Sequence, residues 1–144
     1  MNPGRPNPPQ GGDEAPRISS PFAGGEVLDL VALATTICDH YRAEFPDEQD
    51  RYGPAGMAWC IHDNQHLLNW AAEAVINDLD MNDEVGWLAN ILEARDFPVG
   101  RLARNLDIGA EVVGRMVSGA PAGQLATMLT GAAEFVRSGD FREC

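Results

Sequence analysis

The sequence predicts an all-α protein, a single-domain bundle of about five helices with a disordered N-terminal tail. Three observations support this prediction. Apolar residues recur at helical spacing from residue 26 onward. No segment alternates apolar and polar residues as a strand does, and short breaks rich in proline or glycine separate the helical patterns. A length of 144 residues and a mass of 15.5 kDa suit one domain with its own core.

The composition divides the chain into three parts. Residues 1–25 are rich in proline and glycine and have little to bury, so we expect a disordered tail. Residues 26–139 should form the helical bundle domain. Residues 140–144 are expected to be a short C-terminal tail.

The first expected helix covers residues 26–45, and Pro46 ends it because the residue before a proline avoids the helical conformation. Its apolar side chains fall on one stripe: Val27, Leu30, Val31, Ala34, Cys38, Tyr41 and Phe45. A polar connection with room for one short helical turn comes next. A second long helix is expected from about residue 55 to residue 79.

Three further helices are expected, over residues 83–95, 98–118 and 121–138. Asn82 suits the N-cap of the first of these, whose acidic first turn matches the helix dipole. Pro98 ends that helix and stands in the first turn of the next one. Gly119 separates the last two helices. Short connections of this kind are typical of an all-α bundle.

The charge balance excludes two classes of partner. Ten basic residues face twenty-two acidic ones, so the net charge is -12. A chain of this charge repels phosphate backbones and anionic lipid surfaces, and we expect neither a nucleic-acid partner nor a membrane partner. No apolar stretch reaches the length that spans a bilayer.

The cysteines predict a reducing environment. Cys38, Cys60 and Cys144 cannot all pair within one chain, and no basic start followed by an apolar run indicates a secretory signal. We therefore expect free thiols and a cytoplasmic location.

The second expected helix has two distinct faces when it is projected at about 100° per residue. Its broad apolar face should belong to the core and contains Cys60, Ile61, Leu67, Leu68, Ala71, Val75 and Leu79. A second stripe, aromatic at both ends and titratable in the middle, contains Trp59, Asp63, His66 and Trp70. His62 and Glu73 flank this stripe.

Two interpretations of the second stripe remain open. In the first, the helix packs on both sides, with His66 hydrogen-bonded in the interior and the tryptophans as packing anchors. In the second, Trp59 and Trp70 are walls of a cofactor pocket for haem or another flat tetrapyrrole. Asp63 and His66 stand one turn apart, a spacing that can hold a metal ion or orient a base. We expect Asp63 to lie close enough to His66 for a hydrogen bond, directly or through water.

The sequence lacks a complete set of residues for the common metal-binding and catalytic sites. No residue is therefore assigned a catalytic role. A di-iron bundle needs two carboxylate-x-x-His motifs, whereas this chain has only Asp63-x-x-His66. Cys60 should lie about 120° around the helix from His66, so the two cannot easily share one ion. We expect Cys60 to be an inert, nearly buried residue. Glycine-rich phosphate loops, HExxH motifs and nucleophile elbows are absent from the sequence.

Residues 50–110 resemble a poorly characterised bacterial all-helical module that is associated with cobalamin-binding sensory and regulatory proteins. The positions that carry the resemblance are Tyr52, Gly53, Cys60, Asp63, His66, Leu67, Trp87, Leu88 and Pro98. The resemblance implies a sensory or regulatory role. The chain has neither an Asp-x-His-x-x-Gly cobalamin loop nor an α/β domain to hold that cofactor.

The sequence thus predicts a non-enzymatic helical sensory or regulatory module that acts through protein–protein contact, with a protein partner or as a homo-oligomer. The alternative is a protein that binds haem, another tetrapyrrole or a metal ion through His66 and Asp63, between Trp59 and Trp70.

Overall fold

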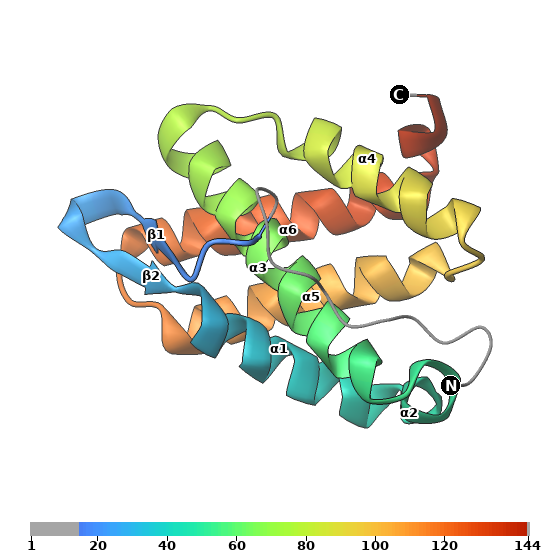
Figure 1. Ribbon diagram of the computed structural model, residues 1–144. Helices are drawn as coiled ribbons and strands as arrows, with labels where there is room; N and C mark the ends of the chain where they lie inside the picture. The colour runs from blue at the N-terminus through green and yellow to red at the C-terminus, as the bar shows by residue number, and fades with distance from the viewer. Residues whose placement is uncertain (1–14, 144) are drawn as a thin grey trace.

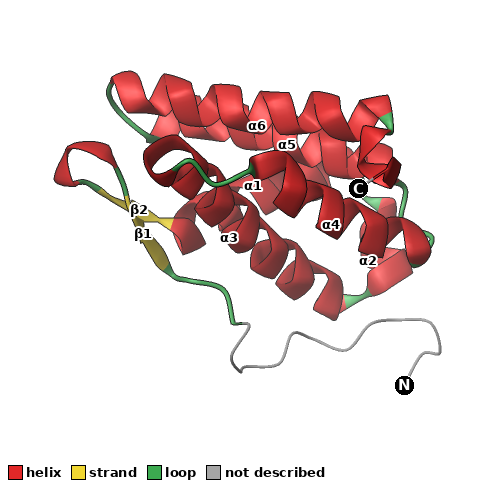
Figure 2. Cartoon of the chain, turned by 90° about the horizontal axis from the view of Figure 1, so that it is seen from above, coloured by secondary structure: helices red, strands yellow, loops and turns green. Residues whose placement is uncertain are grey.

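The computed structural model of the protein describes residues 15–143. Within this range the chain is mainly helical, as Figures 1 and 2 show. Its elements are β1 (Ser19–Pro21), β2 (Val27–Asp29), α1 (Leu30–Glu44), α2 (Asp47–Tyr52), α3 (Pro54–Asn77), α4 (Met81–Ala94), α5 (Val99–Met116) and α6 (Ala120–Ser138), with short 3-10 turns at Ala23–Gly25 and Asp140–Glu143. The predicted all-α fold is confirmed, and the expected turn after the first helix is α2.

The helices pack in two layers around one core. Helices α5 and α6 form an antiparallel pair, and α1 and α3 pack against this pair (Figure 1). Helix α4 lies against α6 and the C-terminal turn. The largest fully buried side chains come from every long helix and from that turn: Leu30, Ile37, Leu67, Leu68, Val85, Leu106, Val112, Val113, Leu125, Leu129, Val136 and Phe141.

The apolar face predicted for the second helix is largely confirmed in α3. Leu67 and Leu68 are 2% and 1% exposed, so the helical phase assigned from the sequence is correct. Cys60 is only partly buried, in contrast to our expectation, because it lies near the start of α3 where less of the bundle covers it. Within residues 15–143, no helix combines the length and apolarity needed to cross a bilayer.

A small hairpin replaces part of the predicted tail. Residues 1–14 of that tail lie outside the described residues, but residues 15–25 are ordered and include β1, which pairs antiparallel with β2. Phe22 and Leu28 are 6% and 4% exposed, since both side chains pack on the helical core. Gly24 and Gly25 supply the positive φ angles of the turn. The ordered domain therefore begins before residue 26, and our expectation that the chain has no strand was wrong.

The starts of two helices also differ from the sequence-based prediction. Helix α1 starts at Leu30 because the Asp29 carboxylate accepts a hydrogen bond from the Ala32 amide at 3.0 Å. The N-cap of α4 is Asp80 and not Asn82, since the Asp80 carboxylate accepts from the Asp83 amide at 3.1 Å.

The expected C-terminal tail is in part a structured turn. The side chain of Phe141 is fully buried, and its carbonyl accepts a hydrogen bond from Asn90 at 3.0 Å. Residues 140–143 therefore belong to the bundle. Residue 144 lies outside the described part of the chain.

Surface arginines tie distant helices together through carboxylates. The pairs are Arg104–Glu44 at 2.8 Å, Arg101–Asp47 at 3.0 Å and Arg142–Glu93 at 2.9 Å. The hydrogen bond from the arginine lowers the pKa of each of these carboxyl groups below its usual value.

These pairs predict a loss of stability in acid. A carboxyl group whose pKa is depressed in the folded state contributes stability above its unfolded pKa, which is lost as the pH falls through the folded pKa. We expect a nearly constant melting temperature from neutral pH to about pH 5 and a decline below about pH 4, the usual range of Asp and Glu. Calorimetry at several pH values tests this expectation. The Glu93→Gln variant should lose less on acidification, and an unchanged melting temperature down to pH 3 would contradict the prediction.

Candidate functional site

The partly exposed face of α3 carries a row of rings that continues onto α4. We call it the aromatic row; it consists of Trp59, His62, His66, Trp70 and Trp87. The first four residues follow one another at three- or four-residue spacing, which places them on one side of the helix. Trp87 comes from α4, which runs beside the C-terminal half of α3.

Each ring of the row contacts the next. The centroid distances are 4.9 Å for Trp59–His62, 4.9 Å for His62–His66, 5.7 Å for His66–Trp70 and 6.5 Å for Trp70–Trp87. His66 and Trp70 are stacked with 28° between their planes, whereas the other three contacts are edge to face. Both arrangements are favourable for aromatic pairs. The structure therefore brings the sequence-predicted residues Trp59, His66 and Trp70 into one continuous array.

The row lies at the surface of the bundle, although Trp70 also packs against the core. Its four α3 residues are all half-buried, and Trp87 is 58% exposed. An indole exposed to that extent is a large apolar surface in contact with water. Trp87 was part of neither interpretation of the second stripe, and both interpretations stay open.

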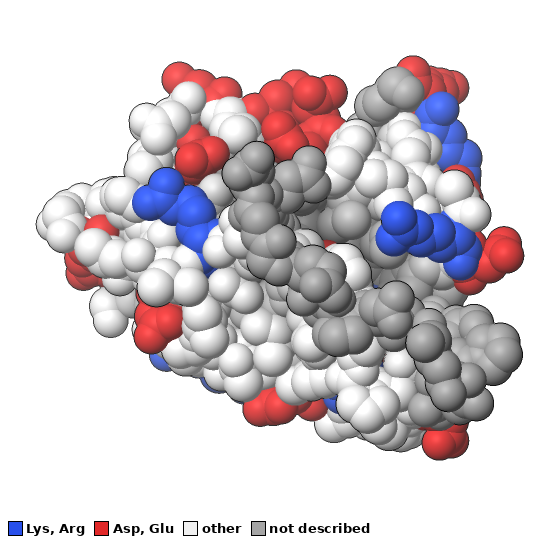
Figure 3. Space-filling model, viewed as in Figure 1, with Lys and Arg blue, Asp and Glu red and all other residues white. Residues whose placement is uncertain are grey.

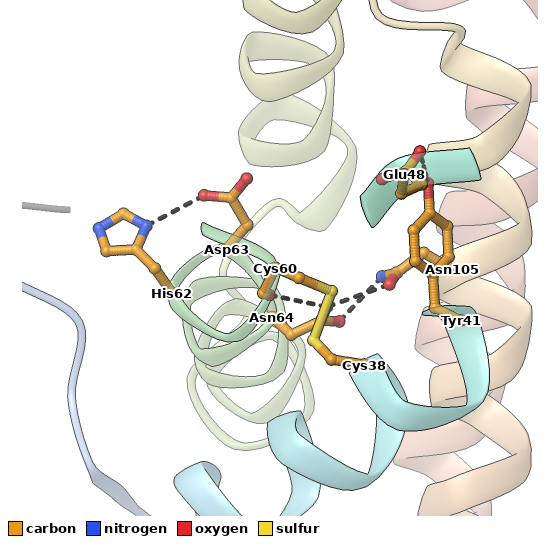
Figure 4. The surroundings of a disulfide bond; sticks show 8 residues. All are labelled: Cys38, Tyr41, Glu48, Cys60, His62, Asp63, Asn64 and Asn105. Carbon is orange, nitrogen blue, oxygen red and sulfur yellow. Dashed lines mark hydrogen bonds and ion pairs between the residues drawn. A yellow bond between two sulfur atoms is a disulfide. The ribbon is translucent and has the colours of Figure 1, made fainter. Parts of the chain in front are cut away.

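The carboxylate of the predicted stripe lies beside His62, a residue that the sequence analysis placed at the flank of the stripe. The Asp63 Oδ1 atom lies 3.0 Å from His62 Nδ1, and the two side chains are 30% and 19% exposed. Figure 4 shows both side chains pointing away from the neighbouring disulfide. The sequence analysis had named His66 as the partner of Asp63. The Asp63 carboxylate can orient the His62 imidazole, although both side chains remain in contact with water.

On the opposite side of the same helical turn, Cys60 forms a disulfide with Cys38 of α1 (Figure 4). The Cα atoms of the two residues are 6.0 Å apart, and 22 positions separate them in the sequence. Cys38 is fully buried. Our expectation of free thiols is therefore wrong for these two cysteines, because the packing of α1 on α3 brings their inward-facing positions together.

Two buried asparagines form the polar neighbours of this disulfide. Asn64 of α3 and Asn105 of α5 exchange two side-chain hydrogen bonds, at 3.0 and 2.8 Å. The Asn64 amide nitrogen also donates to the Cys60 carbonyl at 3.0 Å and lies 3.4 Å from the Cys38 sulfur. Both residues are less than a tenth exposed, so the reciprocal bonds satisfy groups that would be costly to bury alone. This network joins α1, α3 and α5.

A second buried polar cluster holds α2 against α1 and α5. The Tyr41 hydroxyl donates to Glu48 at 2.9 Å, and the Arg101 guanidinium donates to the same carboxylate oxygen at 2.8 Å. Arg101 also lies over the Phe45 ring, 4.4 Å from its centroid. Burial, with the added effect of the Glu48 charge, raises the pKa of the Tyr41 phenol. The cluster is saturated with internal partners, which fits a structural role.

The described residues offer limited means to hold a metal ion. No group of three His, Cys, Asp or Glu side chains within residues 15–143 is arranged to hold one. The two surface hollows that we describe also lie away from the aromatic row. One, of about 800 Å³, lies between α6, the end of α3 and the first turn of α4. The other, of about 400 Å³, lies beside the hairpin.

Comparisons with protein-family models, curated proteins and solved structures identify no protein similar to this chain. The resemblance of residues 50–110 to a helical module of cobalamin-associated regulators therefore stays a prediction.

Sequence reasoning found the residues of the second stripe but missed their neighbours. Trp87 was named among the positions that carry the resemblance, but it was not placed beside the second stripe. Asn64 and Asn105 gave no signal, because an asparagine in a helical pattern is usually exposed. The cysteines did give a usable signal, since Cys38 and Cys60 both fell on inward-facing stripes of successive helices.

Proposed function

We propose that the protein is a non-enzymatic helical regulatory module that binds a partner protein through the aromatic row. The observation that carries this proposal is the row itself, which ends in a highly exposed tryptophan. Tryptophan is enriched among the residues that dominate the energy of protein–protein interfaces. Half-buried rings that already contact one another lose little conformational freedom on binding.

The charge around the row supports a cationic partner segment. Between Arg51 and Arg95 the chain has seven acidic residues and no lysine or arginine, and this stretch contains all of α3 and α4. Figure 3 shows acidic atoms gathered along the upper edge of the molecule, where Figure 1 places α4 and the α3–α4 connection. Lysine and arginine bind the faces of indole rings through cation–π contacts. We therefore propose a partner segment rich in arginine or lysine.

Binding to a probe peptide tests this proposal. Labelled deca-arginine is titrated into the wild type, into Trp87→Ala and into the matched control Met116→Ala, which removes an exposed apolar side chain (47% exposed) outside the row. We expect Trp87→Ala to weaken binding about fivefold, which corresponds to about 1 kcal/mol for one exposed cation–π contact. Met116→Ala should bind as the wild type does, and added salt should weaken binding for all three proteins.

Equal binding by all three proteins would show that bulk charge attracts the peptide, and the row would then lose its proposed role. Turnover of a substrate by the purified protein, lost in His66→Gln, would contradict the non-enzymatic part of the proposal. A catalytic site needs a nucleophile or a stabiliser of developing charge in addition to one carboxylate–imidazole pair.

A second candidate function is binding of haem, another tetrapyrrole or a metal ion by His66 with Asp63. The position of His66 between other rings at the surface favours a flat ligand over a globular one. Titration with haemin distinguishes this candidate. A Soret shift that disappears in His66→Gln but persists in His40→Gln, a histidine at the exposed end of α1, would support it.

The cytoplasmic location also stays a proposal, and the disulfide provides its test. Disulfides persist in oxidising compartments and are reduced in most cytosols. Trapping of thiols at the moment of cell lysis, followed by mass spectrometry, should find Cys38 and Cys60 as thiols if the protein resides in the cytoplasm. Recovery of the pair as a disulfide would place the protein elsewhere.

A further inference from the structure

The hairpin at one end of the bundle has two edges, and the register shows which backbone groups each edge presents (Figures 1 and 2). Phe22 donates to the Glu26 carbonyl at 2.8 Å, and Leu30 donates to the Ile18 carbonyl at 3.0 Å. Hydrogen-bonded pairs alternate with non-bonded pairs in an antiparallel ladder. The backbone groups of Val27 and Asp29, which oppose Pro21 and Ser19, therefore point away from β1.

The outer edge of β1 is closed to another strand. Pro21 has no N–H to donate, and the Ser19 carbonyl already accepts from Arg17 Nε at 3.1 Å. Helix α3 also covers this edge, since Gln65 Nε2 donates to the Arg17 carbonyl at 2.9 Å. Such devices protect a strand from pairing with another chain. The outer edge of β2 has no proline, and no helix within residues 15–143 covers it as α3 covers β1.

Exposed apolar side chains lie on both sides of the hairpin and at the start of α1. Ile18, Val27 and Val31 are 72%, 66% and 39% exposed, and all three line the hollow of about 400 Å³ beside the hairpin. An exposed apolar group next to an open strand edge is typical of an interaction site.

The low charge of the hairpin end indicates which partner can approach the outer edge of β2. Residues 15–38 carry only Arg17, Glu26 and Asp29, a net charge of -1, although the whole chain carries -12. Two copies of so acidic a chain repel each other over most of their surfaces, so they can approach most closely where charge is sparse. The hairpin end is mainly uncharged in Figure 3 as well.

We propose that the outer edge of β2 pairs with β2 of a second copy of the chain. In an antiparallel arrangement with its two-fold axis at Leu28, Val27 of each copy faces Asp29 of the other. The Asp29 amide of each copy then donates to the Val27 carbonyl of its partner. A surface of this kind is self-complementary, as a two-fold interface requires. This inference concerns a different face from the aromatic row and does not depend on the proposed function.

The size of this interface predicts a reversible dimer. A three-residue strand and one small hollow bury less than the roughly 1,200–2,000 Å² of stable complexes. The dimer should therefore dissociate on dilution. Higher salt should strengthen it, because salt screens the remaining repulsion between two acidic copies.

Sedimentation velocity over a range of concentrations tests the proposal. We expect the wild type to shift from monomer to dimer as its concentration rises, and Val27→Glu to weaken the dimer about tenfold or more, because it places two further carboxylates in the contact. The matched control is Ile76→Glu, at a residue in the last turn of α3 that is 38% exposed and does not belong to the hairpin or its hollow, and this variant should dimerise as the wild type does.

Amide hydrogen exchange of the wild type provides a readout that needs no variant. Exchange at the Asp29 amide should slow as the protein concentration rises, while exchange at exposed amides of α6 stays constant. A monomer at every concentration, a dimer unaffected by Val27→Glu, or a dimer equally weakened by Ile76→Glu would overturn the proposal.

Discussion

Reduction of the Cys38–Cys60 disulfide is expected to lower the free energy of unfolding by about 3 kcal/mol, the loss of the restriction that a closed loop of this length places on the unfolded chain. Its 22-residue separation exceeds the 15 residues for which about that value is typical. Chemical denaturation with and without reductant measures the effect.

The double variant Cys38→Ala/Cys60→Ala separates the disulfide from other effects of the reductant. Reductant should bring the wild type close to the stability of this variant and leave the variant itself unchanged. The control is Cys144→Ser, which keeps the pair and should respond to reductant as the wild type does. Indifference of the wild type to reductant would show that the pair contributes nothing to stability.

Replacement of Glu48 by alanine is expected to cost about 3 kcal/mol, the lower end of the range for breaking a buried ion pair. Glu48 accepts from both Tyr41 and Arg101, and its side chain is 6% exposed. The alanine variant leaves a buried hydroxyl and a guanidinium without this partner. The Arg101 side chain is 22% exposed and keeps some contact with water, so we expect a loss at the lower end of the range for buried ion pairs.

Asp47→Ala provides the matched control for this prediction. Asp47 is the other carboxylate that binds Arg101, at 3.0 Å, but its side chain is 52% exposed. An exposed pair is worth only about 0–1 kcal/mol. Urea denaturation should therefore separate the two variants by about 2 kcal/mol or more. Equal losses would mean that burial of Glu48 does not decide the strength of its bonds.

Association through the aromatic row and association through the hairpin edge should depend on salt in opposite ways. Binding at the row should weaken with salt because it depends on attraction, whereas pairing of β2 should strengthen with salt because repulsion opposes it. The sign of the salt dependence thus assigns an observed association to one face or the other.

The sequence by itself determined the helices and the inner face of α3. Leu67 and Leu68 were assigned to the core from spacing alone, because an amphipathic helix must turn its apolar stripe inward whatever it packs against. The same reasoning placed Trp59, His66 and Trp70 on a second face. Helix ends were less certain, since Asp80 and Asn82 are both good caps and only the backbone shows which one is used.

Only the tertiary structure decided which side chains meet. The disulfide and the bonded pair Asn64–Asn105 join residues 22 and 41 positions apart, and local pattern contains no information about contacts of that range. The hairpin was hidden for a related reason. Its three-residue strands are too short to show alternation. They are held by Phe22 and Leu28, whose burial depends on the helical surface that they pack against.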